Sequence, residues 1–192
     1  MRQHLQFYID GQWVDPVAPK TSDVINPATE EVSGQISLGS VADVDKAVAA
    51  AHRAFPAWSR SSVAERLELL KEIQALYAKR QQEIGEAVTE EMGAPIALGT
   101  GFHVGLGAGH LQTAIEILEN FAFEEKRGNT LIVKEPIGVC GLITPWNWPL
   151  NQVTVKLFPA LAAGCTTILK PPQLAPYSAQ ILAEILHDAG TP

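Results

Sequence analysis

Two short loops carry the side chains whose types and spacing could support chemistry. The first, TPWNWP over residues 144–149, places the Asn147 amide between two tryptophans and two prolines. Prolines fix the backbone, and tryptophans cover polar groups with apolar bulk. An amide donor held rigidly in a dry pocket stabilises developing charge on a substrate oxygen better than a mobile donor in water. Asn147 is therefore a candidate oxyanion-stabilising group, although the spacing alone equally favours a cap on the following helix.

The second loop, KPPQLAP, begins at Lys170. The ammonium of Lys170 could bind a phosphate or a sugar hydroxyl, and the amide of Gln173 could bind a ribose diol. From the sequence alone, a solvated lysine at a strand end and an ordinary turn residue are the favoured interpretations. Lys156, in the middle of a predicted helix, reads as a surface lysine whose stem covers apolar surface. Trp146 and Trp148 read more readily as packing residues than as substrate walls.

The elements around these loops follow the order strand, loop, helix, strand, loop, helix. They cover residues 137–144, 149–164, 165–170 and 175–190, and we expect Pro159 to kink or split the first helix. This order predicts two parallel strands, the second buried, joined by a right-handed crossover. Ligands of such sheets bind beyond the carboxyl ends of the strands. If the strands are neighbours, the side chains of Asn147, Lys170 and Gln173 form one polar cluster.

The preceding residues predict a small β arm followed by helices. A hairpin is expected over 7–14 around Asp10-Gly11, and a second pair of strands over 23–37. Helical spacing predicts helices over 41–54, 62–79, 82–95 and 108–122, the second with a capping box at Ser62 and Glu65. The glycine-rich residues 99–109 lack the G-x-G-x-x-G spacing and a preceding strand, so they predict close helix packing or a flexible connection, not a nucleotide loop.

Composition limits the class of protein. The 192 residues carry a net charge of −7 and are 46% hydrophobic, which fits one domain plus an arm and argues against nucleic acid or an anionic membrane as partner. No basic leader precedes an apolar run, and no apolar stretch nears the roughly 18 residues of a membrane span. We therefore expect a soluble, cytoplasmic protein.

The cysteines and histidines show no metal-ligand or disulfide pattern. Cys140 and Cys165 are far apart in the sequence and lie in apolar surroundings, so they are interpreted as small buried hydrophobic residues. His103 and His110 would share a helix face, but no acidic or cysteine ligand stands nearby. We expect structural histidines and no metal.

Together these segments resemble one family. The run EPIGVCGLITPWNWPLNQVTVKLFPALAAGCTTILKPPQLAPYSA resembles the core signature of the aldehyde dehydrogenase superfamily, and FYIDGQWV, VINPATEEVSGQI and DVDKAVAAAHRAFPAWS resemble its opening. The resemblance covers essentially the whole chain, is most specific over 135–176, and is strongest to bacterial enzymes of broad or catabolic role. It implies an α/β fold: a partial Rossmann-like parallel sheet with flanking helices, an N-terminal β arm and an oligomerisation hairpin.

For the cofactor, the resemblance implies NAD or NADP. Thr144, Pro145 and Trp146 would border its nicotinamide end, and Lys170 would hydrogen-bond the adenosine ribose. The family usually has glutamate at the position of Gln173, where the carboxylate accepts from the ribose hydroxyls and repels a 2′-phosphate. The neutral side chain of Gln173 removes that repulsion, so the preference between NAD and NADP stays open.

For the substrate, the resemblance implies a small-molecule aldehyde. Asn147 corresponds to the oxyanion-hole amide, Trp148 and Gln152 fall where the family lines its aldehyde tunnel, and Lys156 matches a lysine near the general-base glutamate. The chain stops at HDAGTP, before the segments that would supply that glutamate and the nucleophilic cysteine. The chemistry needs a thiolate to attack the aldehyde before hydride leaves, so we expect no aldehyde oxidation by this chain alone.

The resemblance also divides the chain. Residues 1–117 would form the β arm and helices of the cofactor-binding domain, 118–136 a hairpin that reaches a neighbouring subunit, and 137–192 the first βαβα part of a truncated sheet. The exposed sheet edges predict a homo-oligomer. The alternatives are a non-catalytic nucleotide-binding or oligomerising remnant and, as a third reading, a different small enzyme that uses Cys140 or Cys165.

Overall fold

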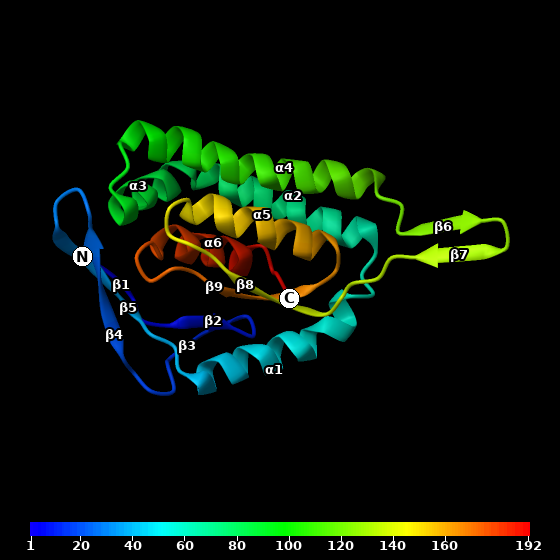
Figure 1. Ribbon diagram of the computed structural model, residues 1–192, viewed down its shortest axis with the longest axis horizontal. Coiled ribbons are helices and arrows are strands. Elements are labelled where there is room, and N and C mark those ends of the chain that lie inside the picture. The colour runs from blue at the N-terminus through cyan, green and yellow to red at the C-terminus, as the bar shows by residue number, and fades with distance from the viewer.

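The N-terminal β arm begins with the predicted hairpin. In the computed structural model, which describes residues 1–192 (Figure 1), β2 (Phe7–Ile9) pairs antiparallel with β3 (Gln12–Val14). The two turn residues, Asp10 and Gly11, have φ values of 58° and 71°. Both angles lie in the left-handed region that a type I′ turn requires, which confirms the turn predicted from Asp-Gly.

The second part of the arm is a three-stranded sheet. The predicted pair is confirmed as β4 (Thr21–Asn26) and β5 (Glu31–Ser37), which are antiparallel. A further strand, β1 (Arg2–His4), lies parallel to β5 on its other side and gives the order β1-β5-β4. The sequence did not predict β1, because three residues are too few to show alternation.

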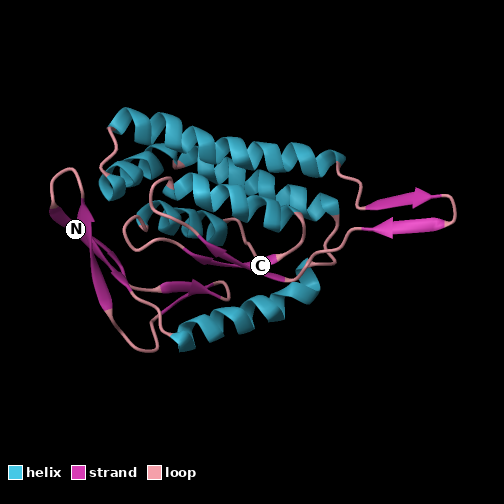
Figure 2. Ribbon diagram, viewed as in Figure 1, coloured by secondary structure: helices cyan, strands magenta, loops and turns pink.

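Helices form the bulk of the fold, as Figure 2 shows. After the arm come α1 (Val41–Trp58), α2 (Val63–Lys79), α3 (Gln81–Met92), the π-helix η1 (Leu98–His103) and α4 (Val104–Asn120). The capping box of α2 is confirmed, because Ser62 Oγ accepts from the Glu65 amide at 3.2 Å and the Glu65 carboxylate accepts from the Ser62 amide at 2.7 Å. Helix α1 continues through Pro56 and ends at Trp58, four residues beyond its predicted end.

The glycine-rich residues 99–109 pack helices closely. A Cβ on Gly99 would collide with the carbonyl oxygen of Gly85 in α3, and one on Gly107 would collide with the Tyr77 hydroxyl of α2. The expectation of close packing is therefore confirmed, and the expected helix start at 108 is wrong. Because these glycines let the helices approach, the helical structure begins ten residues earlier, at Leu98.

The βαβα unit completes the chain. It consists of β8 (Val139–Ile143), α5 (Pro149–Ala162), β9 (Thr166–Lys170) and α6 (Tyr177–Asp188), and β8 pairs parallel with β9. Helices α1 and α5 both contact the two strands, and Figure 1 shows them on opposite sides. The expected split of α5 at Pro159 is wrong, because the helix is continuous there. The strand β9 is mostly half-buried, so the expectation of a buried strand is only partly met.

A second hairpin projects from the body (Figure 1). It consists of β6 (Glu124–Arg127) and β7 (Thr130–Val133), which pair only with each other. Its base is held by Phe121 and Phe123, whose rings lie 4.7 Å apart, and by Lys134, whose ammonium lies 4.6 Å from the Phe121 ring. Within the expected hairpin range of 118–136, residues 118–120 still belong to α4. None of the helices combines the length and the apolar character needed to cross a membrane.

Candidate functional site

The two predicted loops meet at one edge of the parallel pair. Ile143 at the end of β8 is the register partner of Lys170 at the end of β9. The Thr144 amide donates to the Lys170 carbonyl oxygen at 3.3 Å, which extends the pairing into both loops. The carboxyl ends of β8 and β9 therefore lie side by side, where ligands of parallel sheets bind.

The first loop begins with a buried hydroxyl that has no partner. The side chain of Thr144 is only 5% exposed, and its Oγ1 forms no hydrogen bond within the chain. Leaving a buried hydroxyl unpaired costs on the order of 1–3 kcal/mol, so such a group fits a polar ligand atom. The next two residues turn outward, with Pro145 exposed and Trp146 54% exposed.

Asn147 is exposed and its amide forms no hydrogen bond within the chain. The interpretation of Asn147 as a helix cap is wrong, because the residue at the N-cap position of α5 is Trp148 and no side chain caps the helix. Pro149 opens the helix, where its missing N–H is tolerated. Both amide hydrogens of Asn147 are therefore available to a ligand from a loop bounded by two prolines.

Aromatic residues from η1 fix the side chain of Trp148. Its ring stacks on His103 with centroids 4.7 Å apart and an interplanar angle of 24°, and it meets Phe102 edge-on at 5.6 Å. His103 is buried, and burial lowers its pKa, so the ring is held neutral beneath the indole. The sequence did not predict this contact. The only signal was the adjacent Phe102-His103 pair inside the glycine-rich segment.

Gln152 and Lys156 lie one helical turn apart on α5. The Lys156 ammonium donates to the Gln152 carbonyl oxygen at 3.0 Å and to its Oε1 at 2.7 Å. Both residues are half-buried. The half-buried side chain of Lys156 agrees with a lysine whose stem covers apolar surface, and its ammonium is bound by Gln152, one turn earlier on the same helix.

The second loop presents polar groups without partners. Lys170 and Gln173 are both exposed, and neither side chain forms a hydrogen bond or an ion pair within the chain. The loop from 170 to 176 contains one cation and no acidic residue. Its donors fit the hydroxyl groups of a nucleotide ribose, and no carboxylate of the loop stands against an added phosphate.

Neither cysteine shows the features of an activated nucleophile. Both thiols are free, with Cys165 buried and Cys140 half-buried. Burial raises the pKa of Cys140, and the neighbouring Cys165 thiol raises it further. The thiolate is the reactive form, so a raised pKa argues against nucleophilic catalysis by Cys140. The interpretation of both as small packing residues is supported.

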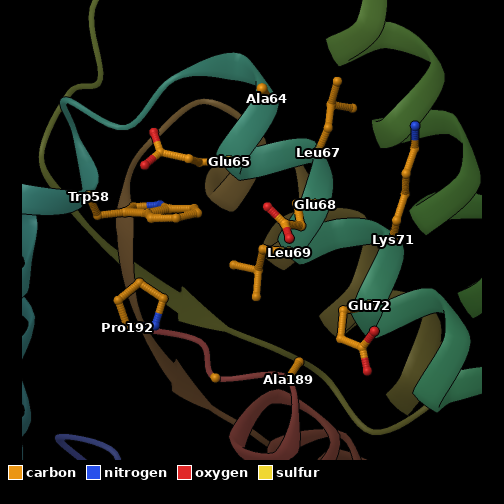
Figure 3. A pocket seen from close by; sticks show the side chains of 11 residues that line it. Trp58, Ala64, Glu65, Leu67, Glu68, Leu69, Lys71, Glu72, Ala189 and Pro192 are labelled. Carbon is orange, nitrogen blue, oxygen red and sulfur yellow. The ribbon is translucent and has the colours of Figure 1, made fainter.

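A hollow of about 870 Å³ lies away from these loops (Figure 3). Its walls come from α2, the end of α1 and the residues after α6, and they include Trp58, Leu69 and Pro192. The carboxylate of Glu65 on its rim is already used in the capping box of α2. The ammonium of Lys71 on the same wall is paired with Glu119, and the remaining charged groups are carboxylates of one helix, Glu68 and Glu72. The hollow does not join two strand ends, so we assign the candidate chemistry to the loop edge.

Comparison with known proteins gives consistent matches along the chain. A family model described as "Aldehyde dehydrogenase family" matches residues 13–192. The chain is 53% identical to "3-succinoylsemialdehyde-pyridine dehydrogenase" from Pseudomonas sp, with all of this chain and 40% of that protein covered.

Solved structures agree. The aldehyde dehydrogenase of Bartonella henselae superposes with a TM-score of 0.97 and 45% identity over 100% of this chain and 41% of that one. A mutant of aldehyde dehydrogenase C from Pseudomonas syringae, in complex with NAD+ and octanal, superposes with a TM-score of 0.96 and 49% identity. This match covers 97% of this chain and 39% of that one. The chain thus spans about 40% of the length of these relatives.

Proposed function

Because the chain belongs to the aldehyde dehydrogenase family, we propose that it is the N-terminal portion of an enzyme that oxidises an aldehyde to a carboxylic acid with NAD+ or NADP+. The observation that carries the proposal is the register of β8 and β9, which brings the loop of Asn147 beside the loop of Lys170. One loop would serve the reacting aldehyde and the other the nucleotide, at an edge where parallel sheets bind ligands.

A bound nicotinamide nucleotide would supply the acceptor for the hydride of the aldehyde, and residues of the two loops would hold it. Lys170 donates to a ribose hydroxyl from the end of β9, and Gln173 offers both a donor and an acceptor to the same sugar. The hydroxyl of Thr144, which has no partner within the chain, would pair with a polar atom of the cofactor, and Pro145 and Trp146 would border its nicotinamide end. The exposure of Lys170 and Gln173 supports these roles, because neither has a competing partner within the chain.

The aldehyde would lie beside α5. Asn147 donates its amide to the aldehyde oxygen as negative charge develops there. The indole of Trp148, backed by the neutral ring of His103, excludes water from that oxygen. Gln152 would line the same side, and the Lys156 ammonium, which donates to Gln152 Oε1, would hold that side chain in place. The resemblance implies that Lys156 lies near the general-base glutamate of the whole enzyme.

We propose that residues 1–192 alone give no aldehyde oxidation. The Cys140 side chain packs against the core and its pKa is raised by burial, and Cys165 is buried. The first experiment is the intact mass of the purified chain together with an NAD+ assay on octanal, the aldehyde bound in one relative. A species of 20.7 kDa that forms no NADH and binds NAD+ supports the proposal. Turnover at that mass would contradict it, and Cys140→Ser and Cys165→Ser would then identify the nucleophile.

A second candidate role is assembly through the hairpin. Both outer edges of the β6–β7 pair are unpaired, and the apolar side chains of Leu131 and Val133 are 57% and 49% exposed. Unpaired edges and exposed apolar groups on a projecting element favour contact with a second copy. We propose a homo-oligomer formed through this hairpin. Light scattering compares the intact chain with a chain in which 124–133 are replaced by a short turn. We expect the intact chain to be an oligomer and the shortened chain to be a monomer. A monomer in the intact chain would contradict the proposal.

A further inference from the structure

A carboxylate on α3, far from both loops in the sequence, contacts the start of α6. Glu91 lies in the last turn of α3 and is 2% exposed. Its Oε2 accepts from the backbone amides of Tyr177 and Ser178, the latter at 3.2 Å, and its Oε1 accepts from the Ser178 hydroxyl at 2.6 Å. The carboxylate therefore satisfies the first amides of a helix that begins 86 residues later in the chain.

The position of this carboxylate stabilises α6 and not its own helix, α3. A negative charge at the end of a helix opposes the helix dipole, so Glu91 does not stabilise its own helix. Helix α6, in contrast, has Pro176 at its N-cap position and no side-chain cap of its own. Glu91 supplies the missing acceptor for the first amides of α6.

The contact also fixes the loop that precedes α6. The N-terminal end of the loop is fixed by the β8–β9 pair, where Lys170 is in register with Ile143. At its second end, Glu91 holds the amide of Tyr177, and the Tyr177 hydroxyl lies 2.9 Å from Ser33 Oγ in β5. Three prolines stiffen the six residues between, and Gln173 lies among them with an exposed side chain.

We propose that Glu91 is a positioning residue for nucleotide binding: by capping α6 it fixes the loop that presents Lys170 and Gln173. This inference rests on the proposed function, because it assigns that loop to the nucleotide. The carboxylate itself does not touch the ligand. Loss of the cap would free the end of the loop, and nucleotide affinity would fall because the loop must then be ordered on binding.

The test compares Glu91→Ala with Glu91→Gln and a control on the same helix. Glutamine keeps an oxygen for the two amides and an NH2 group for Ser178 Oγ, so it should rescue the alanine variant. Glu86→Ala is the matched control, since Glu86 is exposed and accepts only from Gln82. Amide hydrogen exchange of 173–178 reports on the loop and the helix start, and isothermal titration calorimetry gives the NAD+ affinity of the full 192-residue chain.

In Glu91→Ala we expect exchange at 173–178 to accelerate by about tenfold or more, the scale of losing such buried hydrogen bonds. The Kd for NAD+ should rise by a similar factor, and Glu91→Gln and Glu86→Ala should stay near wild type. If Glu91→Ala fails to fold, Ser178→Ala removes only the hydroxyl contact and should show the same local pattern with a smaller amplitude.

The two readouts separate the two proposals. Unchanged exchange at 173–178 in Glu91→Ala, or in Ser178→Ala where that variant replaces it, would overturn the positioning role. Faster exchange with an unchanged NAD+ Kd would also overturn it, since the cap would then be structural only. If the wild-type chain binds no NAD+, the nucleotide role of the loop falls, and the positioning role, which rests on it, falls as well.

Discussion

Replacing Arg66 by methionine tests how the chain holds α5 in place. The guanidinium is 5% exposed and has no carboxylate partner. Instead it donates to the carbonyl oxygens of Ser59 at 3.1 Å, Ser61 at 2.9 Å and Ala162 at 3.3 Å, and to the Ser61 hydroxyl at 2.9 Å. Two of these carbonyls lie at the carboxyl ends of α1 and α5, where the helix dipoles favour a cation.

The size of the loss follows from these contacts. Each hydrogen bond to a charged group contributes about 1.5–3 kcal/mol, while removing the buried cation recovers part of its desolvation cost. We therefore expect Arg66→Met to lower the free energy of unfolding by about 3 kcal/mol. Urea titration followed by circular dichroism gives the value by linear extrapolation. Arg66→Lys should lose less, because its ammonium keeps some of the carbonyl contacts.

Arg60→Met is the matched control, because Arg60 is exposed and forms no ion pair. Its free energy of unfolding should change by no more than about 0.5 kcal/mol, as is usual for surface substitutions. If Arg66→Met and Arg60→Met were equally stable, the carbonyl cluster would not hold α5, and the reasoning from these contacts would be refuted.

Three further outcomes follow from the fold and the loops. Gly99→Ala should lower the free energy of unfolding by about 1–3 kcal/mol, since its Cβ would collide with the carbonyl oxygen of Gly85. The control Gly101→Ala should leave the free energy of unfolding nearly unchanged in the same urea titration, because no atom lies within 4 Å of its Cβ. Burial raises the pKa of Glu91 from 4.5 to about 7, so ionisation costs more in the folded chain, and stability should fall by about 3 kcal/mol as pH rises through that window. That decline should be absent in Glu91→Gln, and a parallel pH profile for both proteins would contradict it. Gln173→Glu should raise the ratio of the NADP+ to the NAD+ dissociation constant about tenfold, because the carboxylate repels a 2′-phosphate. Calorimetry gives both constants, and the same ratio in wild type and variant would argue against contact of residue 173 with the ribose.

Local signals in the sequence predicted local structure well. Asp10-Gly11 demands left-handed backbone and forms the predicted turn, and Ser62 with Glu65 forms the predicted capping box. The alternation of strand and helix after residue 137 also predicted the parallel pair, because such connections leave few topologies. The candidate site depended on that pairing, so the meeting of the two loops followed from the sequence.

Other features depended on packing that no short window reveals. Pro56 and Pro159 lie inside continuous helices, because buried neighbours in the same turns hold the backbone helical despite the lost hydrogen bond. The contact of His103 with Trp148 joins a π-helix to a loop more than 40 residues later. No signal in the sequence pointed to Glu91, because its partners Tyr177 and Ser178 lie 86 and 87 residues later and only the packing of α6 against α3 buries the carboxylate as a cap.

The projecting hairpin has a consequence for how such a chain can diverge. Strands β6 and β7 pair only with each other, and their base is fixed by Phe121, Phe123 and Lys134. Adding or removing one residue pair beyond that base alters the reach of the hairpin by about 3.4 Å, the rise of one strand residue, and does not change the pairing of β8 with β9. The reach and the surface chemistry of the hairpin can therefore change without moving the loops of Asn147 and Lys170, so the proposed subunit contact and the proposed ligand-binding edge are structurally independent.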